Sequence, residues 1–285
     1  MAAVVFGPDR VGHGSSRRTA LVLGAGGVLG AAWMTGALAR LQDRLPCAAG
    51  DVDVIVGTSA GSVLAAALRC HAPVEEMMAW QRGGFAEYPR CLPALPPLPR
   101  WRFGSVPLAR AALLAPHRVP PWVGASAWLP HGRGQHAALR SLVGALHLRH
   151  HRRAAPGGAP PHWVSGHTWV CAVDYDTGQR VLFGQQGAPR ASLTEAVVAS
   201  CSIPGWYEPT VIGGRRYVDG GVRSSTSLGV LGGTDVQDVY VLAPMASTET
   251  DHPLQPHLRM ERQWRQVITL AVLRQAKALC AEGSA

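Results

Sequence analysis

Residues 52–64 constrain the fold more than any other part of the sequence. A run of β-branched apolar residues leads into a Gly-x-Ser-x-Gly pattern and then into small residues typical of a buried helix: Gly57-Thr58-Ser59-Ala60-Gly61. This order predicts a strand, a sharp turn and a helix, with the Ser59 hydroxyl at the tip of the turn. We expect glycine at both ends of the pattern because side chains there would clash where the strand and the helix approach closely. The helix N-terminus would also favour negative charge developing beside Ser59.

A glycine-rich loop follows an earlier apolar run, at residues 19–23, which predicts a short buried strand. A helix is expected from about Ala31, with Pro46 after its end. Between them lies the loop Gly24-Ala25-Gly26-Gly27-Val28-Leu29-Gly30. It could bind the phosphates of a dinucleotide, which would make the chain an oxidoreductase. It could instead point several backbone N–H groups at an oxyanion. The second interpretation is favoured because the next strand ends in the Ser59 turn, at the same edge of a parallel sheet.

Residues 19–39 carry no charge and follow two arginines, a pattern that imitates a membrane span or an export signal. Five glycines in this stretch favour the strand, loop and helix instead. No other stretch is long and apolar enough to span a bilayer. The six cysteines lie far apart without metal-binding spacing, which is typical of reduced thiols. We therefore expect a cytoplasmic protein, with or without peripheral contact with a membrane.

A third motif lies much later in the chain, at Tyr217-Val218-Asp219-Gly220-Gly221. Taken alone, Asp-Gly after a valine favours a hairpin turn. Taken with the two earlier motifs, Asp219 becomes the candidate carboxylate partner of Ser59.

With these three motifs, the chain resembles the patatin-like phospholipase family through the runs LVLGAGGVLGAAWMTGAL, VIVGTSAG and YVDGG. A helix ending in Ala199-Ser200-Cys201-Ser202-Ile203-Pro204, opened by a Ser192–Glu195 capping box, fits the same family. The resemblance runs from about Thr19 to Leu242. It implies an α/β fold of three layers, α/β/α, with a mainly parallel central sheet.

The resemblance also implies an activity, that of a serine acyl hydrolase acting on lipid esters. Ser59 would attack the ester carbonyl, and Asp219 would accept its proton directly. The N–H groups of Gly26, Gly27 and Val28 would form the oxyanion hole. No cofactor or metal is implied, and the implied partner is a lipid or acyl-ester substrate.

Two positions depart from the family pattern. Leu29 stands where the family usually has Arg or Lys, and Ala25 replaces one of the usual glycines. Oxyanion stabilisation would then rest on backbone donors alone. A non-catalytic lipid-binding relative is therefore an alternative. Another alternative is a hydrolase with a triad completed by His252 or His257.

A proline-rich segment at residues 89–130 contains three tryptophans interleaved with arginines: Trp101, Trp122 and Trp128. Proline at this density predicts irregular structure. The segment is either an ordinary surface insertion or a lid that contacts a membrane, because Trp and Arg favour the lipid interface. A basic linker is expected after it, from His147 to Pro161.

The predicted organisation is a leader at residues 1–18 and a single domain at 19–285, with residues 89–163 forming the insertion or lid and the linker. A hairpin is expected at 168–183 and a last helix at 258–279. The net charge of +9 either reflects composition or attracts anionic surfaces. No nucleic-acid partner is expected, since no binding motif accompanies the charge.

Overall fold

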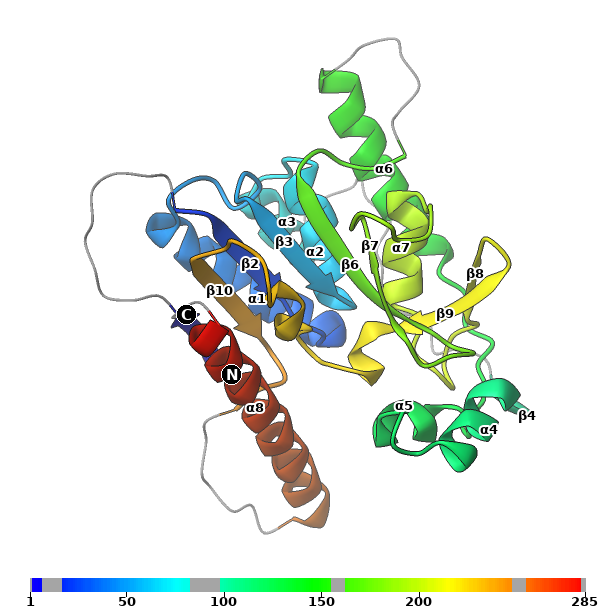
Figure 1. The fold of residues 1–285 in the computed structure, drawn as a ribbon. Coiled ribbons are helices and arrows are strands. Elements are labelled where there is room, and N and C mark those ends of the chain that lie inside the picture. Colours follow the sequence, from blue (N-terminus) through cyan, green and yellow to red (C-terminus); the bar gives the residue numbers. More distant parts are fainter. Residues whose placement is uncertain (1, 7–16, 83–97, 155–161, 248–254, 283–285) are drawn as a thin grey trace.

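The computed structural model describes residues 2–6, 17–82, 98–154, 162–247 and 255–282 (Figure 1). A central sheet has four parallel strands in its middle, in the order β10 (Asp238–Ala243), β2 (Thr19–Leu23), β3 (Val54–Thr58) and β6 (His167–Asp174). The flanking strands pair antiparallel: β1 (Ala2–Phe6), β7 (Arg180–Phe183), β8 (Thr210–Ile212) and β9 (Arg215–Asp219). The sheet is therefore mixed, and parallel at its centre.

Helices cover both faces of this sheet, which gives the predicted three layers. On one face Leu21, Leu23 and Ile55 pack against α1 (Gly27–Leu41), α2 (Ala60–Arg69), α3 (Val74–Gln81), α6 (Ala137–Ala154) and α7 (Leu193–Ser200). On the other face Val22 and Val56 pack against α8 (Pro256–Glu282) and the short helix η3 (Leu228–Leu231). Alternate residues of each strand point to opposite faces, so strands covered on both sides are apolar throughout.

Helix α1 begins at Gly27 rather than at the expected Ala31. The Gly30 N–H already donates to the Gly26 carbonyl oxygen at 2.9 Å, which closes the first helical turn within the glycine loop. The hydrophobic pattern could not reveal this turn, because its residues are glycines and exposed apolar side chains. The early start makes the end of the glycine loop a helix N-terminus.

Residues 2–6, expected within a loose leader, form strand β1. This strand pairs antiparallel with β10 along its whole length. Without it, β10 would be an edge strand with a row of unpaired backbone groups. The remainder of the expected leader up to residue 16 lies outside the described residues.

The proline-rich segment is more regular than predicted. It contains α4 (Val106–Leu114), α5 (Pro121–Ser126) and a small ladder of β4 (Arg100–Phe103) and β5 (Pro130–His131). Pro107 and Pro121 lie in the first turns of α4 and α5, where the missing N–H of proline has no helical partner to lose. These prolines therefore start helices instead of breaking them. Residues 89–97 lie outside the described part of the chain.

The expected basic linker is likewise helical as far as Ala154, within α6. The buried side of this helix starts with Leu142, Val143 and Leu146 and continues with His147 and His151, which are each 8% exposed. Histidines here occupy positions at which an amphipathic helix usually carries apolar residues. The linker prediction was wrong for residues 147–154, because histidines at buried positions interrupt the pattern of apolar residues that would indicate a helix.

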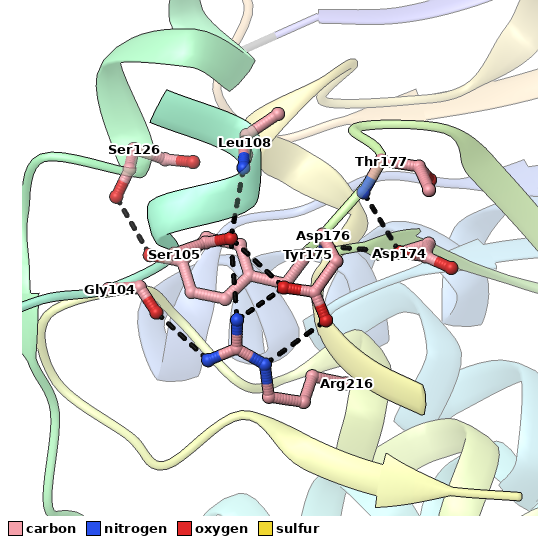
Figure 2. A network of polar contacts seen from close by, with 9 residues as sticks. All are labelled: Gly104, Ser105, Leu108, Ser126, Asp174, Tyr175, Asp176, Thr177 and Arg216. Atoms are coloured by element: carbon pink, nitrogen blue, oxygen red, sulfur yellow. Dashed lines mark hydrogen bonds and ion pairs between the residues drawn. The ribbon is translucent and has the colours of Figure 1, made fainter. Parts of the chain in front are cut away.

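The insertion is fastened to the sheet by a polar network around Arg216 of β9 (Figure 2). The Arg216 guanidinium donates to both carboxylate oxygens of Asp176 and to the Gly104 carbonyl oxygen, at 3.1 Å in the latter case. The Tyr175 hydroxyl donates to the Ser126 carbonyl oxygen at 2.8 Å. Hydrogen bonding to Arg216 lowers the pKa of Asp176.

An apolar cluster lies beneath the network. Leu108 and Val123 of the insertion pack against Val173, Tyr175 and Val218 of the sheet. The insertion is thus docked on β9 directly before Asp219.

Candidate active site

Strand β6 brings Ser59 and Asp219 together. Strand β3 runs parallel to β6 and ends with Thr58 opposite Cys171, whereas β9 runs antiparallel and ends with Asp219 opposite Ala172. Strand β7 pairs with residues 170–173 of β6. These include residues that also pair with β3 and with β9, so β7 must lie on the other edge of β6. Strands β3 and β9 therefore share one edge of β6 and meet end to end. This register places Asp219 beside the residue that follows Thr58.

Ser59 sits at the predicted turn between β3 and α2, with φ 53° and ψ −122°. A positive φ is strained for a residue with a side chain and is typical of functional turns. A methyl group at position 57 would lie 2.6 Å from Ser62 Cα, and one at position 61 would lie 2.0 Å from the Leu23 carbonyl oxygen. The prediction that Gly57 and Gly61 permit a close approach is confirmed.

Ser200, the last residue of α7, holds the turn in place. Its hydroxyl accepts a hydrogen bond from the Ser59 N–H at 2.8 Å and donates to the Cys171 carbonyl oxygen at 2.6 Å. The side chain is fully buried. From the sequence, Ser200 is predicted only as part of a helix. A small polar residue directly after the apolar run Ala196-Val197-Val198-Ala199 is the signal that could have identified it.

Asp219 is buried, with 5% of its surface exposed. Its Oδ1 accepts a hydrogen bond from the Gly221 N–H at 2.7 Å. Burial raises the pKa of Asp219 to about 6, although the nearby Ser59 side chain and the Gly221 N–H oppose the rise. A carboxyl group with a pKa near neutral can exchange protons at physiological pH. Gly220 is required next to it, since a methyl group there would lie 2.4 Å from the Cys171 carbonyl oxygen.

The backbone N–H groups of the glycine loop are of two kinds, those with an acceptor in the protein and those without one. The N–H groups of Gly24 and Ala25 donate to the Leu242 and Ser225 carbonyl oxygens, at 2.9 and 2.6 Å. The following N–H groups lie at the N-terminus of α1, where helix geometry provides no acceptor. Among the described residues, no acceptor pairs with the N–H of the three residues predicted for the oxyanion hole: Gly26, Gly27 and Val28.

Close contacts join the three motifs into one site. The close approach of Gly61 to Leu23 packs the start of α2 against the strand that leads into the glycine loop. A methyl group on Gly221 would lie 3.3 Å from Ala25 Cβ, so the loop after Asp219 touches the glycine loop as well. Only small side chains fit between these three turns.

Several other candidates lie away from this site or outside the description. His252 lies outside the described residues, and His257 is described only as a backbone position in α8. Within the described chain, no group of three His, Cys, Asp or Glu side chains is placed to hold a metal. None of the described helices is both long and apolar enough to cross a membrane. Trp122 and Trp128 are exposed on the insertion.

This fold and site define a class of α/β proteins in which a serine on a strand–helix turn faces a buried carboxylate beside a helix N-terminus. Residues 21–231 match the sequence profile of the family described as patatin-like phospholipase, and the chain belongs to this family. Membership supports a lipid ester hydrolase activity in general terms.

One similar solved structure is that of type III effector protein ExoU. It is 17% identical, with a TM-score of 0.36, and the match covers 96% of this chain and 55% of that chain. The chain thus spans about half the length of that protein. A search of curated proteins finds no match.

Proposed function

We propose that this protein is a serine acyl hydrolase that releases fatty acid from lipid esters through a Ser59–Asp219 dyad. The observation that carries the proposal is the register of β3 and β9 on one edge of β6, which places the Ser59 turn next to the buried Asp219 carboxylate. This arrangement gives a weak nucleophile a base within reach, as covalent catalysis requires. The match to the patatin-like family supports the lipid-ester class of substrate.

The reaction proceeds in two steps. Ser59 Oγ attacks the ester carbonyl carbon while its proton passes to Asp219, and the resulting oxyanion accepts hydrogen bonds from the N–H groups of Gly26, Gly27 and Val28. The intermediate collapses, the alcohol leaves with the proton from Asp219, and the acyl group stays on Ser59. Water, deprotonated by Asp219, then attacks the acyl group. Fatty acid leaves, and Ser59 regains its proton.

The oxyanion hole in this proposal uses backbone donors alone, since Leu29 replaces the usual basic residue. Each such donor contributes about 3 kcal/mol to the stability of the transition state in comparable sites. The N-terminus of α1 adds a positive dipole end.

Labelling with a fluorophosphonate probe tests the proposal directly. The probe should modify Ser59, with the modified peptide identified by mass spectrometry, and the Ser59→Ala protein should stay unlabelled. A panel of short and long acyl esters, with Ser59→Ala as the blank, then defines the acyl preference. A folded chain that neither takes the label nor cleaves any ester would instead be a non-catalytic lipid-binding relative.

The rate should depend on pH through Asp219. The carboxylate must be deprotonated to accept the Ser59 proton, and burial raises its pKa to about 6. We expect kcat/KM to rise about tenfold per pH unit below pH 6 and to level off above it. A pH–rate profile with a short soluble ester measures this, with circular dichroism confirming the fold at each pH. A profile that is flat down to pH 4.5 contradicts the proposed role.

Ser200→Ala should lower kcat. The substitution leaves the Ser59 N–H without its acceptor inside the protein, which loosens the turn and costs about 1–3 kcal/mol of unfolding free energy. Ser202→Ala is the matched control, because Ser202 is also fully buried but its hydroxyl bonds to Val198 and Thr210, away from the turn. Its backbone carbonyl, which accepts a hydrogen bond from the Asp219 N–H, is kept in the alanine variant. Both variants should lose stability in urea, and only Ser200→Ala should lose turnover. Equal kcat values would assign Ser200 a purely structural role.

A further inference from the structure

Helix α8 is apolar on two sides. Its inner side contributes Ile268, Val272 and Ala276 to the core of the sheet. A second set recurs every three or four residues and is 40–70% exposed: Met260, Trp264, Val267, Leu270 and Leu273. A helix that only covers a sheet needs one apolar stripe and carries polar residues opposite it. The second stripe therefore calls for a partner.

The exposed stripe continues onto the insertion. Trp264 meets Trp122 of α5 edge to face, with the ring centroids 4.9 Å apart, and both rings remain about half exposed. Trp128 and Leu129 are also exposed on the insertion, at 48% and 43%. We call the exposed side chains of α8 and of residues 122–129 the apolar face.

The apolar face lies next to the candidate active site. Helix α5 packs against the short helix η2 (Gly220–Val222), which directly follows Asp219. Arg265 of α8 donates to the Pro244 carbonyl oxygen, and a methyl group on Gly26 would lie 2.7 Å from the Pro244 ring. At the start of α1, Leu29 is 81% exposed. In Figure 1 the arrowheads of β2, β3 and β10 point to the side on which α5 and the first half of α8 lie.

Both parts of the chain that form this face carry an excess of positive charge. Residues 98–131 of the insertion hold four arginines and no Asp or Glu, and residues 255–282, which contain α8, hold five Lys or Arg against two Glu. Arg110 and Arg118 of the insertion are exposed, as are Arg274 and Lys277 of α8.

We infer that the apolar face docks on an anionic lipid surface and presents the Ser59 site to it. Exposed tryptophans and leucines enter the interfacial region of a bilayer, and arginines bind its phosphates. Leu29, in place of the usual basic residue, adds exposed apolar surface in the first turn of α1. The inference deepens the proposed function and rests on it for the orientation toward a lipid ester.

Vesicle cosedimentation of the full chain carrying Ser59→Ala tests the docking without catalysis. The protein should bind vesicles of phosphatidylcholine mixed with phosphatidylglycerol, bind phosphatidylcholine alone much less, and be released by high salt. Adding Trp122→Ser and Trp264→Ser should weaken binding about tenfold or more. Val211→Ser should not, because Val211 is 62% exposed but lies on β8, at the opposite end of the sheet from β1 and β10. Circular dichroism and urea midpoints check that each variant is folded.

The outcomes separate this inference from the proposed function. No binding to anionic vesicles, or equal binding by the tryptophan double variant, overturns the docking even if soluble esters are cleaved. A chain that binds vesicles but cleaves no ester keeps the docking and overturns the hydrolase. Light scattering tests whether a second copy of the chain covers the apolar face instead. If the unaltered chain is a dimer and the double variant is a monomer, the face is a dimer interface and the lipid-docking inference is overturned.

Discussion

Asp219→Asn should lower ester hydrolysis by about 10³-fold and, at neutral pH, make the protein more stable. The loss of activity follows because the amide cannot accept the Ser59 proton, and general bases of this kind contribute about 10² to 10⁴ in rate. The gain in stability follows because the folded protein holds a buried carboxylate whose pKa is raised to about 6. A difference of two pKa units corresponds to about 3 kcal/mol, which we take as an upper value.

The size of this stability gain depends on pH in a defined way. The folded-state pKa of Asp219 lies above the ordinary value of 3.8, so the folded state holds its proton more tightly than the unfolded state does. Stability from this group is therefore full below about pH 4 and falls as the pH rises toward 6. Urea unfolding of the Asn variant and the unaltered chain should differ by about 1–3 kcal/mol at pH 8 and converge near pH 4.

Asp176→Asn is the matched control for this prediction. Hydrogen bonding to Arg216 lowers the pKa of Asp176, so its charged form stabilises the fold above about pH 4, and this stability is lost as the pH falls below that. The same substitution should therefore destabilise the protein at pH 8, by about 1 kcal/mol for a partly exposed pair. It should also leave most of the hydrolase activity. Full turnover in Asp219→Asn, or equal stability changes in the two variants, would contradict the assignment.

Gly61→Ala should destabilise the fold by about 3 kcal/mol or more. The added methyl group would lie 2.0 Å from the Leu23 carbonyl oxygen and 2.9 Å from that of Gly24. Backbone cannot rotate away as a side chain can, so either α2 or the start of the glycine loop must move. Because Ala60 and Gly61 begin the helix behind Ser59, this movement should also abolish catalysis in any protein that remains folded.

Gly36→Ala controls for the general effect of alanine in a helix. Gly36 lies in the interior of α1 with open space around the position of the new methyl group. This variant should gain up to about 1 kcal/mol, because alanine favours helix more than glycine does. Urea unfolding followed by far-UV circular dichroism measures both variants. A Gly61→Ala protein as stable as Gly36→Ala would show that α2 and β2 do not approach closely.

Local features of the fold were predictable because they depend on near neighbours in the chain. The Ser192–Glu195 capping box starts α7 as expected, with both reciprocal hydrogen bonds present. The uncharged stretch after Arg18 forms β2, a glycine loop and α1 rather than a single long helix. In each case the backbone geometry follows from caps, glycines and apolar period within a few residues.

Features that depend on distant partners were missed. The helical period of α6 is hidden by the buried His147 and His151, and the prolines of the insertion proved to be helix starts. The partners of Arg216 lie far from it in the sequence, in the insertion and in the hairpin after β6. Helix α8 has two sets of apolar residues, and only its packing on the sheet determines which set is buried and which is exposed.

The sequence by itself determined which residue types sit at the three tight turns and hence the family, because glycines, Ser59 and Asp219 lie in short motifs that local sterics impose. Only the tertiary structure decided that β3 and β9 end against each other on one edge of β6, which places the Ser59 turn beside Asp219. It also decided the pKa of Asp219, because exclusion from water depends on the packing of residues from the whole chain.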